Sequence, residues 1–191
     1  MIIPKNIFND TATAYSDKSD GDLQKAKALF QLMNNHSLVN FGSSLATFAL
    51  SLRLPVSPLF KWTVYNHFCG GETFEECKQT IQKLEAREVG VLLNYGVELK
   101  EREEDFNKTV EKNLEALHFG RSNKSVKGLC IKLTGFGRFA LYEKIQQKEK
   151  LDADEETEFK KVSERFEKLC KAAAKNGVPL YVDAEESWIQ N

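Results

Sequence analysis

Three short apolar segments, each ending in polar residues, constrain the fold of this chain more than any other feature. Amphipathic helical patterns separate the segments along the sequence. Near-continuous apolar strands that alternate with helices are typical of a parallel sheet with both faces covered. Functional sites in such sheets lie at the carboxyl ends of the strands. The predicted strands are Val89–Tyr95, Gly128–Thr134 and the segment that begins at Val178.

Charged residues follow at or near the end of each predicted strand. Glu98 follows the first strand and Lys132 lies near the end of the second. The third segment, residues 178–186, ends in several carboxylates, which include Asp183 and Glu185. Because parallel strands end at the same edge of a sheet, we expect Glu98, Lys132 and Asp183 to converge on a common rim.

Helical periodicity fills the intervals between the strands. Apolar residues recur at helical spacing in three stretches. The end of the last helix is predicted at Asn176 and Gly177, where Gly177 and Pro179 mark the change from helix to strand. The order is β-α-β-α-α-β, and right-handed crossovers place the strands side by side. The three stretches contain Phe106, Val110, Leu114 and Leu117; Phe139, Leu141 and Ile145; and Phe159, Val162, Phe166, Leu169 and Ala173.

An all-helical arm, residues 1–68, precedes the first strand. Ser19 with Asp22 predicts the start of its first long helix. A second helix is predicted over Leu38–Leu52, and a third over Leu59–Phe68 after two prolines. We expect the arm to be one domain and residues 69–191 to be another.

The second domain opens with a glycine pair and a capping signature. Thr73 and Glu76 predict a capping box for the helix that follows Gly70 and Gly71. That helix is expected to bury Phe74 and the apolar residues that follow it at helical spacing.

The apolar stretch Leu38–Leu52 is too short to cross a bilayer, which takes about 20 apolar residues. We interpret it as a packed helix. Its apolar stripe also suits docking on a membrane surface, and this alternative stays open. The stripe consists of Phe41, Leu45, Phe48 and Leu52.

The composition is that of an ordinary globular protein. The chain has 191 residues, of which 41% are hydrophobic and 29% charged, with a formal net charge of −1. This balance gives no general attraction to nucleic acid, and no nucleic-acid partner is expected. The four cysteines and three histidines are not spaced as metal ligands or as a disulfide framework, so no metal is expected. We expect reduced core thiols in a cytoplasmic protein.

Four motifs in a fixed order resemble the proline dehydrogenase family of flavoenzymes, and most closely its single-function bacterial type. Phe68–Thr73 precedes the first amphipathic helix of the second domain, and Asn94–Glu98 ends the first strand. Ile131–Gly135 ends the second strand and Val182–Glu185 ends the third. The resemblance covers essentially the whole chain.

This resemblance implies a fold, a cofactor and a reaction. The fold is α/β: the first three βα units of a variant (β/α)8 barrel, preceded by the N-terminal helical arm. Family members hold FAD at the strand carboxyl ends. They oxidise L-proline to Δ1-pyrroline-5-carboxylate and pass the electrons to a quinone. The expected location is the cytoplasm, and peripheral contact with the inner membrane is the alternative that stays open.

The resemblance also implies roles for individual residues. Lys132 corresponds to the lysine that binds the substrate carboxylate beside the flavin, and Asp183 to the carboxylate that orders the flavin site, which makes both candidate catalytic residues. Glu98 resembles the glutamate that closes the substrate site, and Glu185 supports the cofactor. Asn94 stands where relatives commonly carry aspartate, so a charge is lost although the amide can still form hydrogen bonds.

Length sets one further expectation. A (β/α)8 barrel takes roughly 250 residues and eight strands, whereas three strands are predicted in these 191 residues. We therefore expect an incomplete barrel that is inactive alone and whose partner is the C-terminal part of the barrel.

Two other classes of function stay open. A lysine that ends a barrel strand beside carboxylates also suits a Schiff-base aldolase, in which Lys132 attacks a carbonyl. The charged helix faces of residues 101–112 and 155–171 suit a non-enzymatic interaction module. Borohydride trapping on Lys132 would identify the aldolase, and FAD binding on co-expression with the remaining strands would favour the flavoenzyme.

Overall fold

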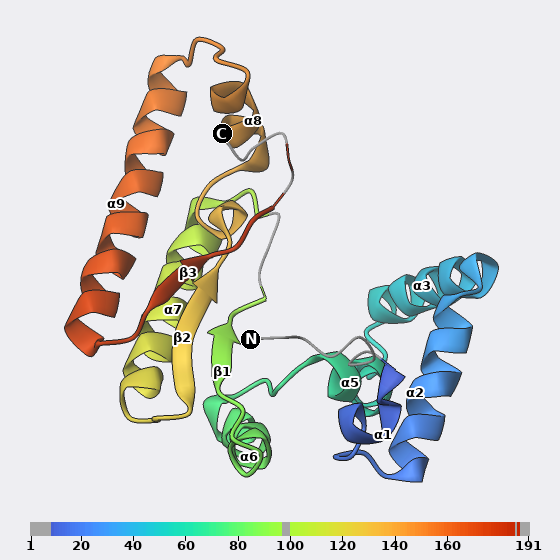
Figure 1. The fold of residues 1–191 in the computed structure, drawn as a ribbon. Coiled ribbons are helices and arrows are strands. Elements are labelled where there is room, and N and C mark those ends of the chain that lie inside the picture. The colour runs from blue at the N-terminus through green and yellow to red at the C-terminus, as the bar shows by residue number, and fades with distance from the viewer. Residues whose placement is uncertain (1–8, 97–99, 186, 188–191) are drawn as a thin grey trace. The chain divides into compact units, whose positions relative to one another are not determined.

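The computed structural model describes residues 9–96, 100–185 and 187, apart from the side chains of Ser57 and Leu59. The chain divides into two compact units, Met1–Gly70 and Gly71–Asn191, called here the N-terminal and C-terminal units. Figure 1 labels most of their elements. Those of the N-terminal unit are α1 (Thr11–Ala14), α2 (Asp20–Met33), α3 (His36–Ser51), α4 (Ser57–Phe60), η2 (Lys61–Tyr65) and α5 (Asn66–Phe68). Those of the C-terminal unit are α6 (Phe74–Glu85), β1 (Val91–Asn94), α7 (Glu103–Arg121), β2 (Val126–Ile131), η3 (Leu133–Gly135), α8 (Phe139–Gln146), α9 (Ala153–Asn176) and β3 (Leu180–Val182).

The helices predicted for the N-terminal unit are confirmed. The Ser19 side chain accepts a hydrogen bond from the N–H of Asp22, whose carboxylate accepts from the N–H of Ser19, so the capping box is complete. After α3 the chain leaves the helix through Arg53, which has a positive φ of 56°. The third predicted helix, Leu59–Phe68, is present as α4, η2 and α5, with a π-helical segment at η2.

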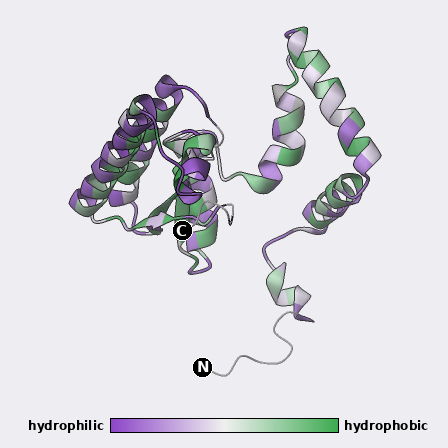
Figure 2. Cartoon of the chain, turned by 90° about the horizontal axis from the view of Figure 1, so that it is seen from above, coloured by the Kyte–Doolittle hydropathy of each residue, from purple (hydrophilic) through white to green (hydrophobic). Residues whose placement is uncertain are grey.

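The N-terminal helices carry much apolar surface and little charge. No residue of α2 or α3 is buried. In Figure 2 the helices of this unit show more hydrophobic colour than the charged helix α9. The stripe predicted on α3 is exposed, with Phe41 at 68% and Phe48 at 61%. Among the described residues, no helix combines the length and the hydropathy needed to cross a membrane.

The described strands form one parallel sheet in the order β1-β2-β3, which confirms the predicted direction and adjacency. The strands are shorter than predicted. β2 ends at Ile131, whose Cα pairs with that of Val182, and the chain then enters the 3-10 turn η3. Lys132 therefore lies one residue beyond β2, because the backbone turns away where pairing with β3 stops.

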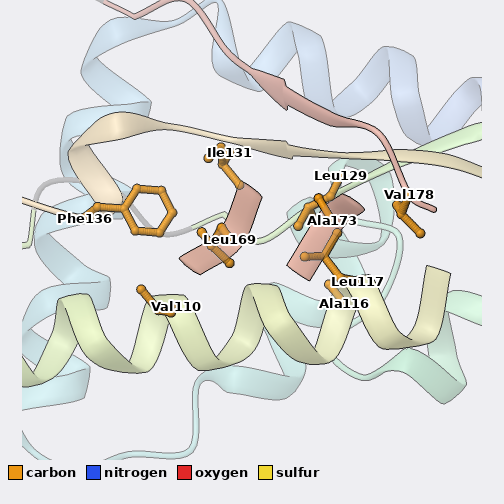
Figure 3. Packing of buried hydrophobic residues seen from close by; sticks show 9 residues of the cluster. All are labelled: Val110, Ala116, Leu117, Leu129, Ile131, Phe136, Leu169, Ala173 and Val178. Atoms are coloured by element: carbon orange, nitrogen blue, oxygen red, sulfur yellow. The ribbon is translucent and has the colours of Figure 1, made fainter. Parts of the chain in front are cut away.

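The core of the C-terminal unit lies between the sheet and two helices. Figure 3 shows Leu129 and Ile131 of β2 facing side chains of α7 and α9, with Phe136 and Val178 at the two ends of the cluster. Leu117, Leu129 and Leu169 are fully buried. Burying one such side chain contributes about 1.5–3 kcal/mol, so this cluster fixes α7 and α9 on the sheet.

The core packing is confined to one face of the sheet. Side chains alternate along strands, which places six side chains, besides Gly128, on the opposite face, called here the open face. Two of them, Leu92 and Tyr181, are 51% and 47% exposed. The expectation that both faces are covered is thus wrong for the described residues. When consecutive strands are neighbours in a sheet and are joined by right-handed crossovers, the connecting helices lie on the same face of the sheet. The open face consists of Leu92, Asn94, Cys130, Lys132, Tyr181 and Asp183.

The cysteines correct a second expectation. All four are free thiols, as predicted, but none lies in the core: Cys69 and Cys170 are exposed, and Cys77 and Cys130 are partly buried. Cys170 follows the buried Leu169 on α9, and a step of one residue turns a helical side chain away from the face of its neighbour.

The capping box predicted for α6 forms only in part. The Thr73 hydroxyl accepts from the N–H of Glu76 at 3.2 Å, as expected. The Glu76 carboxylate instead accepts from the N–H of Glu72 at 2.8 Å, one residue earlier than the box requires. Gly71 permits this close turn, because a Cβ there would lie 2.7 Å from the backbone nitrogen of Cys77.

Leu169→Ala is expected to destabilise the C-terminal unit by about 2–5 kcal/mol, because it leaves a cavity between α9 and β2. Leu92→Ala removes the same atoms from an exposed position and should cost less than about 0.5 kcal/mol. Urea unfolding followed by circular dichroism measures both. Equal losses for the two variants would contradict the one-sided core.

A pH dependence follows from the start of α9. The Glu155 carboxylate accepts from the ammonium of Lys144 at 2.5 Å and from the N–H of Asp152 at 3.1 Å. Lys144 first, and then Asp152, holds the pKa of Glu155 below its usual 4.5. A lowered folded-state pKa contributes stability that is present above 4.5 and lost as the pH falls through the folded value.

Glu155→Gln is therefore expected to reduce stability at neutral pH and to have a diminishing effect as the pH falls below about 4.5. Urea unfolding at a series of pH values measures this. Glu156→Gln is the matched control, because it removes an equal charge from the same helical turn and leaves the Lys144 contact in place. A Glu155→Gln effect that is constant with pH would refute the assignment.

Candidate functional site

Lys132 and Asp183 lie together at the carboxyl ends of β2 and β3, on the open face. Because Ile131 pairs with Val182, the next residue on each segment is Lys132 or Asp183. The Lys132 Nζ is 4.0 Å from the Asp183 Oδ2, and the side chains are 26% and 45% exposed. The structure thus brings these two predicted residues together. An ion pair this open to solvent contributes only about 0–1 kcal/mol, so other contacts must fix its geometry.

Glu185 joins the ends of the same two segments. Its Oε2 accepts from the N–H of Thr134 at 3.0 Å, and its Oε1 accepts from the Thr134 hydroxyl at 2.5 Å. We call this pair of contacts the Thr134–Glu185 bridge. Hydrogen bonds to a charged group are worth about 1.5–3 kcal/mol each, more than the exposed ion pair beside them. Both carboxylate oxygens of this predicted cofactor-site residue are therefore engaged by the protein itself.

Tyr142 holds the turn after β2 from the side of α8. Its hydroxyl donates to the backbone oxygen of Leu133 at 2.7 Å. Burial, with a further contribution from Glu185, raises the pKa of Tyr142, so the hydroxyl stays protonated and remains a donor at neutral pH. The residue directly after Lys132 is thus fixed by a partly buried hydrogen bond.

Arg165 of α9 is a buried cation that binds the same turn. Its Nη1 donates to the backbone oxygen of Phe136 at 2.9 Å, and its Nε donates to Asn107 Oδ1 at 3.1 Å. Its Nη2 donates to Glu103 of α7. The side chain is 7% exposed, and these partners compensate the cost of burying its charge.

Sequence reasoning missed Arg165 because it lies in a run of charged residues that is typical of a solvated helix face. One pattern could have found it. Arg165 is three residues after Val162 and four before Leu169, which places it on the buried side of α9. A charged residue at such a position needs buried partners.

The remaining predicted residues are placed as follows. Glu98 lies outside the described residues. Asn94 ends β1 on the open face, exposed, with its Cα paired to that of Cys130. Burial first, and then Asp183, raises the pKa of the Cys130 thiol, which favours its protonated form. No group of histidine, cysteine or carboxylate side chains in the described part of the chain is arranged to hold a metal ion.

The open face thus presents the Lys132 ammonium beside the Asp183 carboxylate at the carboxyl edge of the parallel sheet. The turn that follows Lys132 is held by Tyr142, Arg165 and Glu185. Such an ammonium can bind a ligand carboxylate or phosphate. A family model described as "Proline dehydrogenase" matches residues 77–191, which include β1, β2, β3 and both site residues. The chain belongs to the proline dehydrogenase family.

Curated proteins that are similar to this chain include two proline dehydrogenases. The mitochondrial proline dehydrogenase 1 of Arabidopsis thaliana is 26% identical over 96% of this chain and 45% of that protein. The corresponding protein of Dictyostelium discoideum is 24% identical over 95% of this chain and 38% of its own length. The carbapenem antibiotics biosynthesis protein CarD of Pectobacterium carotovorum subsp. carotovorum is 31% identical over 77% of this chain and 39% of that protein. The chain therefore spans less than half the length of these relatives.

Gly128→Ala is expected to push β3 away from β2. A Cβ at Gly128 would lie 2.5 Å from the Tyr181 ring and 2.8 Å from the backbone oxygen of Pro179, which accepts from the N–H of Leu129. Overpacking of this kind costs about 1–3 kcal/mol. Urea unfolding and amide exchange at Leu129 measure the effect.

Gly96→Ala is the control for this prediction, because a Cβ at Gly96 meets nothing within 4 Å. Adding Tyr181→Ala to Gly128→Ala should recover only part of the stability, since the Pro179 oxygen remains in the way. Full recovery would show that the ring alone sets the spacing of β2 and β3.

Proposed function

We propose that the protein acts as an FAD-dependent proline dehydrogenase, which oxidises L-proline to Δ1-pyrroline-5-carboxylate in proline catabolism. The observation that carries the proposal is the Lys132–Asp183 pair at the carboxyl ends of neighbouring parallel strands, within the stretch that matches the family. Relatives that cover almost the whole chain are named proline dehydrogenases.

The proposed scaffold is a (β/α)8 barrel, of which β1, β2 and β3 are the first three strands. Three features support it: the strands are parallel, they lie in sequence order, and their helices cover a single face. In a barrel the other face of the sheet points inward. The open face is then the interior, and the strands that complete the barrel correspond to the part of the relatives that this chain does not match.

The described residues fit a flavin and substrate site at this edge. Lys132 and Asp183 are partly exposed on a face that the helices leave free. In the proposal, the Lys132 ammonium binds the carboxylate of proline, and Asp183 holds that ammonium in place. The chemistry that FAD supplies when bound is acceptance of a hydride from the ring carbon next to nitrogen. The task of this chain is to hold the substrate ring in a fixed orientation.

Three further residues have supporting roles in the proposal. Glu98 closes the substrate site. Glu185 supports the cofactor edge indirectly, because its two oxygens already accept from Thr134. Asn94 lies on the same face and supplies a neutral amide in place of the aspartate common in relatives, which changes the charge near the site but keeps hydrogen-bonding capacity.

The proposal includes an electron acceptor and a location. Electrons pass to a quinone, and the protein works in the cytoplasm in contact with the inner membrane. The exposed stripe on α3 supports the contact, because Phe41, Leu45, Phe48 and Leu52 are each more than half exposed. An apolar helix face of this kind rests in the boundary between lipid headgroups and acyl chains.

Lys132→Ala is expected to raise the KM for L-proline about 10- to 100-fold, the equivalent of losing one charge-assisted hydrogen bond, while FAD stays bound. The chain is produced together with a polypeptide that carries the unmatched part of the relatives. Proline-dependent bleaching of the flavin absorbance gives KM and kcat. Lys171→Ala, at an exposed position on α9, is the control and should leave both unchanged.

Other outcomes point to the alternative functions. Borohydride trapping of a carbonyl compound on Lys132 would support the aldolase. A stable assembly that binds no flavin would support an interaction module. An enzyme that oxidises proline with the same KM after Lys132→Ala would remove Lys132 from the substrate site.

A further inference from the structure

The Lys132–Asp183 pair lies between two interactions that join the ends of β2 and β3. On the strand side, the N–H of Asp183 donates to the backbone oxygen of Ile131 at 2.8 Å. On the far side, Thr134 donates twice to Glu185 through the Thr134–Glu185 bridge. The pair is thus flanked by the Asp183–Ile131 backbone hydrogen bond on one side and by the Thr134–Glu185 bridge on the other.

The two ends are not held equally. The turn after β2 is attached to α8 through Tyr142 and to α9 through Arg165. By contrast, β3 has only the three residues Leu180–Val182, and its pairing with β2 ends at the Asp183 N–H. Past that point, Glu185 attaches the end of β3 to the turn through its two hydrogen bonds with Thr134. The ion pair is too long and too exposed to do this by itself.

We propose that Thr134 and Glu185 are positioning residues for Lys132. By fixing the end of β3 on the turn after β2, the bridge sets the separation of Lys132 and Asp183 and so the direction of the Lys132 ammonium. Its effect on substrate binding rests on the proposed function. Neither residue contacts the substrate in this proposal.

The first test uses the chain without flavin or proline. Thr134→Val keeps the shape of the side chain but removes the hydroxyl donor, and Thr134→Ser restores a hydroxyl. Amide hydrogen exchange is read at Asp183, next to the bridge, and at Leu129, whose N–H donates to Pro179 in the same ladder. Thr134→Val is expected to speed exchange at Asp183 by about tenfold or more while Leu129 changes less than about twofold.

The controls separate local loosening from general destabilisation. Thr134→Ser should exchange like the wild type. Glu185→Ala removes both hydrogen bonds of the bridge and should speed Asp183 exchange at least as much as Thr134→Val, which removes only the one from the hydroxyl. Adding Thr134→Val to Glu185→Ala should change little, because that hydrogen bond is already lost. Equal acceleration at Asp183 and Leu129, or no acceleration at either, would overturn the proposal.

The second test uses the flavin-loaded assembly and L-proline. Thr134→Val is expected to raise KM about tenfold with kcat within about twofold, and Thr134→Ser should restore KM. An unchanged KM beside faster Asp183 exchange would overturn the positioning role. A wild-type assembly that does not oxidise proline would refute the proposed function, while the exchange result would still decide whether the bridge holds the end of β3.

Discussion

The packing of α7 and α9 against a single face of the parallel sheet is the constraint on which the rest of the C-terminal unit depends. Leu117, Leu129 and Leu169 are excluded from water together, and this apolar cluster packs α7 and α9 against β2. The opposite face then carries the polar chemistry. Lys132 and Asp183 share it because both lie an odd number of residues from the core-facing Leu129 and Leu180.

The contacts of the turn after β2 fix the position of the site more firmly than the exposed Lys132–Asp183 ion pair does. Tyr142, Arg165 and Glu185 each bind one part of this turn, from α8, from α9 and from the end of β3. Two of these contacts reach backbone oxygens, which do not change with side-chain identity along the turn. The turn that carries Lys132, for which we propose a role in substrate binding, is thereby held by groups that have no contact with the substrate in that proposal.

Local sequence rules predicted much of this fold. Ser19 with Asp22 forms the expected capping box, and Gly177 ends α9 with a positive φ of 65°. Three predictions differ in detail from the structure. The cysteines are predicted to be core thiols, but the side chain of Cys170, one residue after the buried Leu169, is exposed. Glu76 reaches Glu72 rather than Thr73 because Gly71 brings the backbone close. β2 ends at Ile131 because its partner strand ends there.

The sequence by itself determined the order of strands and helices, the family, and two of the residues that meet at the sheet edge, because periodicity and short motifs are local properties. Only the tertiary structure decided which face of the sheet stays open and which groups hold the site. Arg165 and Phe136 are 29 residues apart, and Thr134 and Glu185 are 51 apart. Contacts of this range depend on how the strands pair and how the helices pack, and no local pattern encodes them.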